Sequence, residues 1–189
     1  MKRKMNRSIE VVLFDVGGVL VENPKFKIFW GDSDSKSLRE QFGERRISTR
    51  TFVKRGARLL GITQKEFLQR YKKAYWSGSI NPRVAKIYDT IQVRKGLYSD
   101  TNPIHMRYLK SKCSALFSKA DVSIISKRKS KVRSYKEIIR MLNVQPNSIL
   151  FIDDNLRYVR LARRSGMVGI LFRSSRQLSF ALKKARLIS

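Results

Sequence analysis

The chain has 189 residues and carries 42 Lys and Arg against 14 Asp and Glu, a formal net charge of +28 at pH 7. This length suits one domain, or one core with an insertion, and 42% hydrophobic residues supply enough apolar surface to exclude whole-chain disorder. Cys113 is the only cysteine and His105 the only histidine, which excludes an internal disulfide and a polyhistidine metal site and fits a reducing compartment such as the cytoplasm.

The first predicted element is a buried strand near the start of the chain. Residues 9–14 (IEVVLF) form a short apolar run that ends at Asp15, and Gly17 and Gly18 follow it. This pattern is typical of a strand that leads into a loop with permissive backbone. Because Asp15 interrupts the apolar run and no small-residue cleavage site follows, the pattern argues against a secretory signal. No apolar run reaches the ~18 residues of a membrane span, so we expect no membrane partner.

The pattern becomes helical between about residues 36 and 92. Apolar residues recur at helical spacing in residues 67–75 and again in residues 84–91. Each stretch predicts a helix, and Pro82 stands at the start of the second one. Thr63 and Glu66 have the spacing of a capping box at a helix start. We therefore predict a helical insertion over residues 23–92, placed within a core formed by residues 1–22 and 93–189.

Short strands and amphipathic helices alternate after residue 92. The predicted strands cover residues 96–99, 122–126, 148–152 and 168–172, and the predicted helices cover residues 105–116, 134–142, 156–165 and 177–185. Such alternation is typical of a parallel sheet with helices on both faces. The predicted fold class is therefore α/β, with a Rossmann-like parallel sheet and a small all-helical insertion after the first strand.

Acidic residues gather where the predicted strands end. Asp15 ends the first strand, Asp100 follows the second, and Asp153 and Asp154 end the fourth. Because ligands of open parallel sheets bind beyond the carboxyl ends of the strands, we expect these carboxylates at one edge. A cluster of carboxylates needs a compensating cation, and Mg²⁺ prefers such oxygen ligands. A hydroxyl and a lysine beside that metal could hold phosphate oxygens.

Four motifs resemble those of the haloacid dehalogenase (HAD) superfamily. In chain order they are residues 11–20 (VVLFDVGGVL), 98–102 (YSDTN), 127–130 (KRKS, with Lys129) and 149–155 (ILFIDDN). Residues 43–48, followed by Phe52, are similar to the cap helices of the small-capped branch that resembles bacterial α-glucose-1-phosphate phosphatases. The resemblance extends over roughly residues 9–180, and the four motifs together are far more specific than any one of them.

The resemblance implies a reaction and a role for each site residue. HAD phosphatases transfer phosphoryl groups with Mg²⁺ through an aspartyl-phosphate, so the implied substrate is a small phosphorylated metabolite. The implied catalytic residues are Asp15 as nucleophile, Ser99 and Lys129. The implied phosphate-binding residues are Gly17, Gly18, Ser99, Asp100 and Lys129. The implied Mg²⁺ ligands are Asp15, the carbonyl of Gly17, Asp153 and Asp154.

The chain departs from the HAD phosphatases at Gly17, where they usually carry a second Asp as general acid and base. General acid–base catalysis contributes about 10²–10⁴-fold to a rate. We therefore expect proton transfer to the leaving group to be slow. The residues alone also leave simpler roles open: Asp15 could cap a turn, Ser99 could begin a helix, and Lys129 could be one solvated charge among many.

The positive charge leaves a second function open. Residues 155–189 contain nine Lys or Arg and no acid. Three of the arginines, Arg157, Arg160 and Arg164, have a spacing that places them on one side of a predicted helix. Such a surface could concentrate small anionic substrates. Alternatively, the chain could be a catalytically weak HAD-like protein that binds nucleic acid or a ribonucleoprotein through this surface. The sequence does not predict the oligomeric state.

Overall fold

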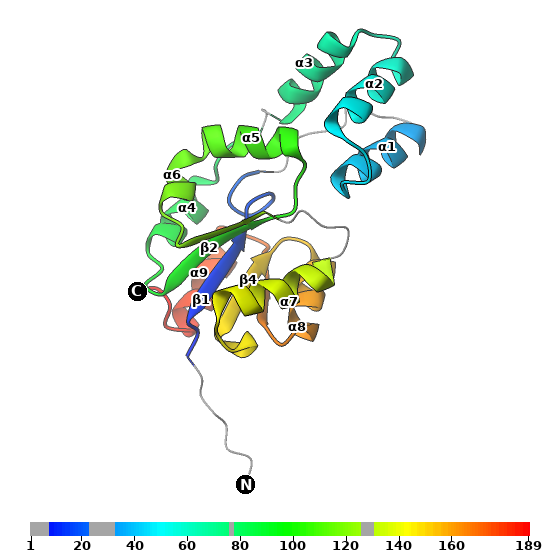
Figure 1. The fold of residues 1–189 in the computed structure, drawn as a ribbon. Helices are drawn as coiled ribbons and strands as arrows, with labels where there is room; N and C mark the ends of the chain where they lie inside the picture. Colours follow the sequence, from blue (N-terminus) through cyan, green and yellow to red (C-terminus); the bar gives the residue numbers. More distant parts are fainter. Residues whose placement is uncertain (1–7, 23–32, 76–77, 126–130) are drawn as a thin grey trace.

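A five-stranded parallel sheet forms the centre of the structure, a computed structural model that describes residues 8–22, 33–75, 78–125 and 131–189 (Figure 1). The strands are β1 (Val11–Asp15), β2 (Arg94–Ser99), β3 (Val122–Ile125), β4 (Ile149–Asp153) and β5 (Val168–Leu171). Their order in the sheet is β3-β2-β1-β4-β5. The chain adds β2 and β3 on one side of β1, and then β4 and β5 on the other. The order therefore reverses between β1 and β4, which is where ligands of such sheets bind.

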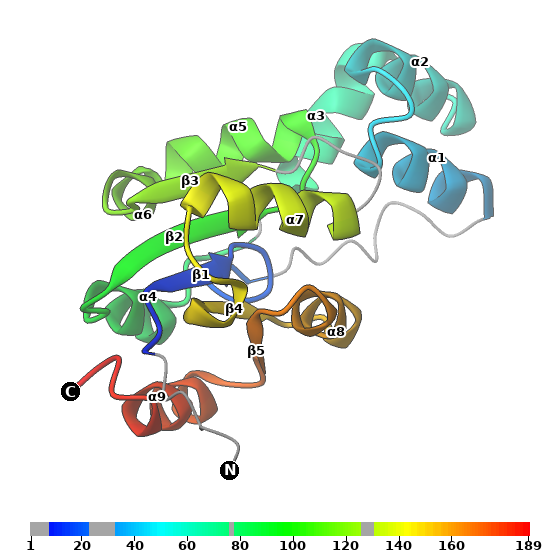
Figure 2. The ribbon, with the colours of Figure 1, turned by 60° about the horizontal axis from the view of Figure 1, so that its bottom comes forward.

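Helices cover both faces of the sheet, as the alternation of side chains along each strand requires (Figure 2). The core helices are α4 (Pro82–Asp89), α5 (Pro103–Lys112), α6 (Ser114–Ser118), α7 (Lys131–Leu142), α8 (Leu156–Arg164) and α9 (Ser175–Lys184). Val12 and Phe14 of β1 belong to an apolar cluster with α4, α5, α6 and α9. Val11 and Leu13 belong to a second cluster, on the opposite face, with α7 and α8. The α/β class and the parallel sheet predicted from the sequence are thereby confirmed.

An insertion of helices lies between β1 and β2. It contains α1 (Ser33–Gly43), α2 (Thr49–Leu59) and α3 (Gln64–Tyr75), which share an apolar cluster of their own. The chain leaves the core and returns to it at neighbouring points, because Val21 pairs with Ile80 and the Glu22 N–H donates to the Ser79 carbonyl at 2.9 Å. Adjacent ends let such a segment be inserted with little distortion of the core.

The helix α4 packs with the sheet rather than with the insertion helices. Val84 and Tyr88 are buried in the cluster that contains Phe14, and the rings of Tyr88 and Phe14 meet edge to face at 5.2 Å. The division predicted from the sequence, with residues 23–92 as the insertion, stays a prediction. By side-chain packing, α1, α2 and α3 are the helices that form the separate unit.

The observed elements follow the predicted ones closely after residue 92. The one helix predicted over 105–116 is two helices, because the chain turns at Cys113 between α5 and α6. A short 3-10 turn (Pro146–Ser148) leads into β4. None of the helices in the described ranges is both long and apolar enough to cross a bilayer.

Candidate functional site

The strand register places two acidic residues side by side. Phe14 of β1 is the partner of Ile152 of β4, so one further step brings Asp15 next to Asp153. Both acids continue the side-chain series that faces α7 and α8, because Leu13 and Phe151 precede them by two residues. Two carboxylates from distant parts of the sequence therefore meet at the carboxyl edge, beside the point where the strand order reverses.

Asp154 completes a cluster of three carboxylates with Asp15 and Asp153. One carboxylate oxygen from each residue lies within 4.8 Å of the others. Asp153 is 1% exposed, and its Oδ1 accepts a hydrogen bond from the Asn155 N–H at 2.8 Å. Oxygen ligands of one Mg²⁺ lie roughly 3–4 Å apart. The cluster thus has the donor type, and nearly the spacing, that a small divalent cation requires.

The backbone after Asp15 turns back on itself at once. The Gly18 N–H donates to the Val21 carbonyl at 2.7 Å, and the Val21 N–H donates to the Val16 carbonyl at 2.8 Å. Gly18 has a φ of 82°, in the region that favours glycine. These hydrogen bonds hold Gly17 and Gly18 in a tight loop directly after Asp15, and their phosphate-binding role stays a prediction.

Ser99 is the last residue of β2 and is buried. It follows Tyr98, the register partner of Asp15, so it lies at the same edge of the sheet as the carboxylates. Asp100 comes directly after it and is exposed. The helix N-cap in this segment is Asn102, whose Oδ1 accepts from the His105 N–H at 2.9 Å. Ser99 is thus not the residue that caps the helix, which was its simpler alternative.

Solved structures match this fold over nearly the whole chain, although no protein-family model and no curated protein matches the sequence. A HAD family enzyme from Bacteroides thetaiotaomicron, in complex with magnesium and inorganic phosphate, is 16% identical with a TM-score of 0.71, covering 88% of this chain and 95% of that one. A predicted HAD-like family hydrolase from Porphyromonas gingivalis is 22% identical with a TM-score of 0.74, covering 97% and 100%. The L-2-haloacid dehalogenase of Xanthobacter autotrophicus is 18% identical with a TM-score of 0.63, covering 96% and 85%.

The chain has the HAD fold. The resemblance found in the four motifs is confirmed at this level. The narrower resemblance to the α-glucose-1-phosphate phosphatase branch stays a prediction, because the matching structures include several kinds of HAD enzyme.

Sequence reasoning missed one residue that lies close to the carboxylates in this HAD core. Tyr135 of α7 is fully buried, and its hydroxyl donates to the Tyr158 carbonyl at 3.4 Å. Burial raises the pKa of Tyr135, and electrostatic interactions with Tyr98, Asp153 and Asp15 raise it further. In the sequence Tyr135 has only the spacing of a core position on a helix, so no local signal set it apart.

The site residues predicted from the sequence fall into three groups in the structure. The structure brings three carboxylates together, those of Asp15, Asp153 and Asp154. The ends of β1 and β2 hold the second group: Gly17 and Gly18 shortly after β1, Ser99 as the last residue of β2, and Asp100 directly after it. Lys129, the predicted phosphate-binding lysine, lies outside the described residues. The basic stripe of α8 is exposed at all three predicted positions, Arg157, Arg160 and Arg164.

Proposed function

We propose that the protein is a Mg²⁺-dependent phosphoric monoester hydrolase that acts on a small phosphorylated metabolite. The observation that carries this proposal is the carboxylate cluster of Asp15, Asp153 and Asp154 at the carboxyl edge of a HAD fold. It is supported by the related structure from Bacteroides thetaiotaomicron, which holds magnesium and inorganic phosphate. Three of the four motifs, those that contain Asp15, Ser99 and Asp153, lie at the ends of strands that neighbour one another in the sheet.

The proposed ligands of Mg²⁺ are the carboxylates of Asp15, Asp153 and Asp154 together with the carbonyl of Gly17. When bound, the ion would neutralise the negative charges that meet there and polarise a phosphoryl oxygen. In this chain the neighbouring hydrogen bond from the Asn155 N–H to Asp153 holds that carboxylate in place. The residues present therefore fit a hard divalent cation.

Asp15 would be the nucleophile. One of its carboxylate oxygens attacks phosphorus, the bond from phosphorus to the substrate oxygen breaks, and the substrate leaves as an alkoxide that takes a proton. Water then attacks the phosphorus of the aspartyl-phosphate, which releases inorganic phosphate and a proton and restores the Asp15 carboxylate. Ser99 and the Asp100 backbone would donate hydrogen bonds to the phosphoryl oxygens, and Lys129 would neutralise their charge.

Gly17 determines which substrates would react well. No side chain at this position can protonate the departing oxygen, so the proton has to come from water or from the substrate itself. Substrates with acidic leaving groups are then expected to react much faster than alkyl phosphates. The φ of Gly17 is not positive, unlike that of Gly18. Its backbone can therefore be adopted by a residue with a side chain.

The test compares wild type with Asp15→Asn, using p-nitrophenyl phosphate with and without Mg²⁺. We expect activity to require Mg²⁺ and to fall by about 10³-fold or more in Asp15→Asn, since a nucleophile is lost. The matched control is Asp34→Asn, which removes an exposed acid of the insertion and should leave the activity unchanged. Unchanged activity in Asp15→Asn would eliminate the mechanism.

A second measurement reads metal binding without activity. Mg²⁺ at about ten times its dissociation constant should stabilise the folded chain by about 1.4 kcal/mol, measured as a rise in Tm. Asp154→Asn should reduce that rise, whereas Asp34→Asn should preserve it. An equal rise in all three proteins would show that Mg²⁺ binds elsewhere.

The role of Gly17 is tested by Gly17→Asp, which restores the carboxyl group found in most HAD phosphatases. We expect its activity on alkyl phosphates to rise by up to about 10²-fold, with a much smaller change on p-nitrophenyl phosphate, whose leaving group needs no proton. An equal effect on both substrates would contradict the assignment.

A further inference from the structure

The outer side of α9 combines cations with an exposed aromatic ring. Arg176, Phe180, Lys183 and Lys184 are spaced at i, i+4, i+7 and i+8, so they lie on one side of the helix. All four are exposed, and Phe180 retains 72% of its accessible surface. Phe180 is the most exposed large apolar side chain among the described residues, and it shares its side of the helix with three cations.

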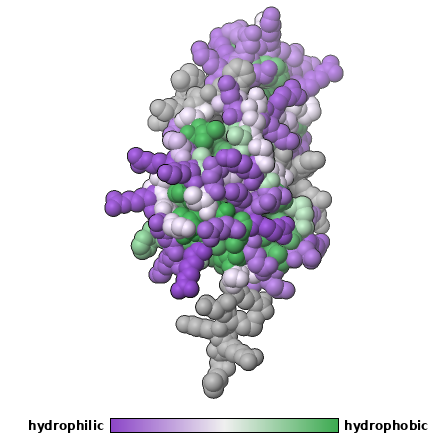
Figure 3. All heavy atoms as spheres, turned by 90° about the vertical axis from the view of Figure 1, so that its left-hand side faces the viewer, coloured by the Kyte–Doolittle hydropathy of each residue, from purple (hydrophilic) through white to green (hydrophobic). Residues whose placement is uncertain are grey.

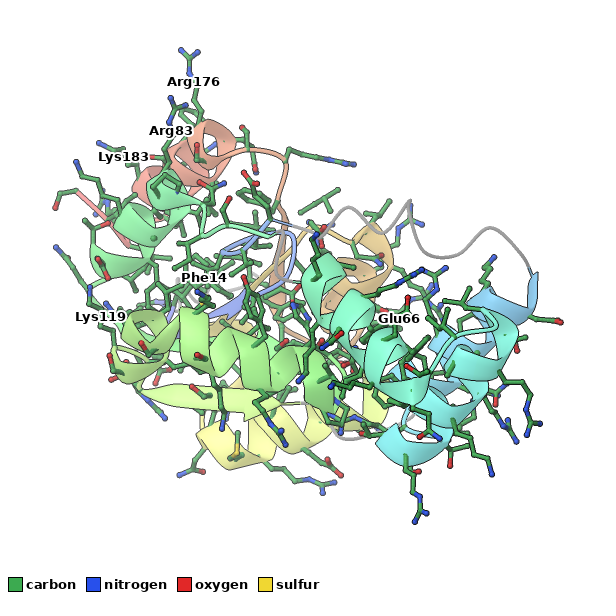
Figure 4. All side chains as sticks on the ribbon, turned by 90° about the horizontal axis from the view of Figure 1, so that it is seen from above. Phe14, Glu66, Arg83, Lys119, Arg176 and Lys183 are labelled. Carbon is green, nitrogen blue, oxygen red and sulfur yellow. The ribbon has the colours of Figure 1, made fainter. Side chains whose placement is uncertain are left out.

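The helix α4 extends this surface, because it packs against α9. Its exposed residues Arg83 and Lys86 add two further cations. Figure 4 shows Arg83, Arg176 and Lys183 at the same corner of the molecule, pointing away from the sheet. Figure 3 shows the left-hand side of the molecule in Figure 1, where hydrophilic side chains surround apolar groups. We call the surface formed by these two helices the α4–α9 face. Its members are Arg83, Lys86, Arg176, Phe180, Lys183 and Lys184.

The positive charge of the α4–α9 face is not balanced by nearby acids. Helices α4 and α9 contain one acidic residue between them, Asp89, and Asp89 forms an ion pair with Lys119 at 2.9 Å. Within the described ranges, none of the five cations of this face takes part in an ion pair. A partner that carries regularly spaced negative charges would complement the surface.

The position of Phe180 favours nucleic acid over a lipid surface. A helix that inserts into a bilayer needs a continuous apolar side, but the apolar side of α9, Leu178 and Leu182, is fully buried in the core. What α9 presents outward is a single ring among cations. Proteins that bind single strands combine these two elements, because a base stacks on the ring while phosphates contact Lys and Arg.

We propose that the α4–α9 face binds single-stranded nucleic acid, with Phe180 stacking on one unpaired base and the surrounding cations contacting the phosphates. This surface is built from elements other than β1 and β4, which carry the carboxylate cluster. Binding there would therefore be separate from phosphate hydrolysis and does not depend on the proposed function.

The experiment measures the binding of the full chain to fluorescein-labelled single strands of RNA and of DNA, each about 12 nucleotides long. Phe180→Leu keeps an apolar side chain but removes the ring, and we expect it to weaken binding about tenfold. The variant Arg83→Gln/Arg176→Gln/Lys183→Gln should also weaken binding and should lower the slope of log affinity against log salt by about 2. The RNA and DNA strands show which sugar is preferred.

The matched control removes the same charge from the insertion. Arg50→Gln/Lys54→Gln/Arg58→Gln changes three exposed residues of α2 and should retain wild-type affinity. Phosphatase activity should be unaffected by Phe180→Leu. Four outcomes would each overturn the proposal. Two concern the variants: equal losses in the two triple variants, or unchanged affinity in Phe180→Leu. The other two concern the wild type: binding to anionic vesicles without binding to either strand, or no binding to the strands at about 50 mM salt.

Discussion

The sheet core and the helical insertion are stabilised in different ways. The core has apolar clusters on both faces of the sheet, and the four apolar residues of β1 are fully buried. The insertion depends on one small cluster with an aromatic centre, in which the rings of Phe42 and Phe52 stack at 4.1 Å and the ring of Tyr71 meets that of Phe52 at 4.9 Å. A unit of this size has few contacts to lose before it opens.

The two regions meet mainly at the segment that follows Ser99. Arg45 of the insertion donates from Nη2 to the Thr101 carbonyl at 2.9 Å, and the Asn102 amide donates to the Tyr71 hydroxyl at 3.3 Å. Ile104 packs against the apolar cluster of the insertion. The core therefore holds the candidate site, whereas the insertion is a second, weaker unit attached beside a predicted phosphate-binding residue.

The largest expected effect comes from truncating the aromatic centre of the insertion. Phe52→Ala should cost about 4 kcal/mol, the usual loss for a fully buried Phe. We expect α1, α2 and α3 to open while the sheet remains folded. Hydrogen exchange measured by mass spectrometry should show lost protection in these helices and retained protection in β1 and β4. Equal loss of protection in both regions would contradict the comparison.

The junction between the regions should respond to pH through His105. This side chain is 7% exposed, and its Nδ1 lies 2.7 Å from the Thr101 hydroxyl. Burial lowers the pKa of His105 from 6.5 to about 4. At a pH between 4 and 6.5, His105 is protonated in the unfolded chain but not in the folded chain. The free energy of unfolding therefore falls as the pH drops from 6.5 towards 4.

This loss should reach about 3 kcal/mol at most, because a tenfold difference in proton affinity between the folded and unfolded chains corresponds to about 1.36 kcal/mol. The measurement is denaturant unfolding at several pH values across this window. In His105→Asn the side chain has no proton to gain, and the contribution of this residue to the pH dependence should vanish. A variant with the same pH dependence as wild type would show that other groups cause it.

Two buried glycines allow the regions to be disturbed by the same substitution. A Cβ on Gly96 of β2 would lie 2.4 Å from Val122 Cγ1 and 2.9 Å from the Val122 carbonyl oxygen, and a Cβ on Gly56 of α2 would lie 2.2 Å from the Phe67 ring. Each change to Ala should cost about 2 kcal/mol through overpacking. Gly96→Ala should lower the Tm of the whole chain, whereas Gly56→Ala should mainly loosen the insertion.

The control for this pair is Gly43→Ala. A Cβ at that position meets no atom within 4 Å, so stability should be unchanged or slightly higher. If Gly56→Ala lowers the Tm at which the sheet unfolds by as much as Gly96→Ala does, the insertion and the core unfold as one unit, which would contradict the comparison.

The smallest expected effect tests the backbone of Arg45, which lies where the two regions meet. This residue has a φ of 60°, in the left-handed region that favours glycine. Arg45→Ala loses the hydrogen bond to Thr101 and keeps the unfavourable backbone, whereas Arg45→Gly loses the bond and relieves the backbone. We therefore expect the Gly variant to be more stable than the Ala variant by about 1 kcal/mol, measured by denaturant unfolding. Equal stability would show that the backbone at this position is not strained.

Much of the core and of the candidate site could be predicted because their signals are local. Short apolar runs that end in Asp15 and in Asp153 indicate strands with acids at their tips, and parallel pairing brings such tips to one edge. The structure brings these two acids together with Asp154. The roles given to all the site residues stay predictions, and Lys129 lies outside the described residues.

The sequence by itself determined where most strands and helices of the core lie and which side of each such helix is apolar, because these properties depend on spacing along the chain. Only the tertiary structure decided what each apolar side packs against. Helix α4 packs on the sheet, although its residues fall within the predicted insertion. Tyr135 interacts electrostatically with Asp153 and Asp15. It also decided that Phe180 stays exposed while Leu178 and Leu182 are buried. The physical reason is that a periodic pattern specifies a direction around one helix, whereas its partners are chosen by segments far away in the chain.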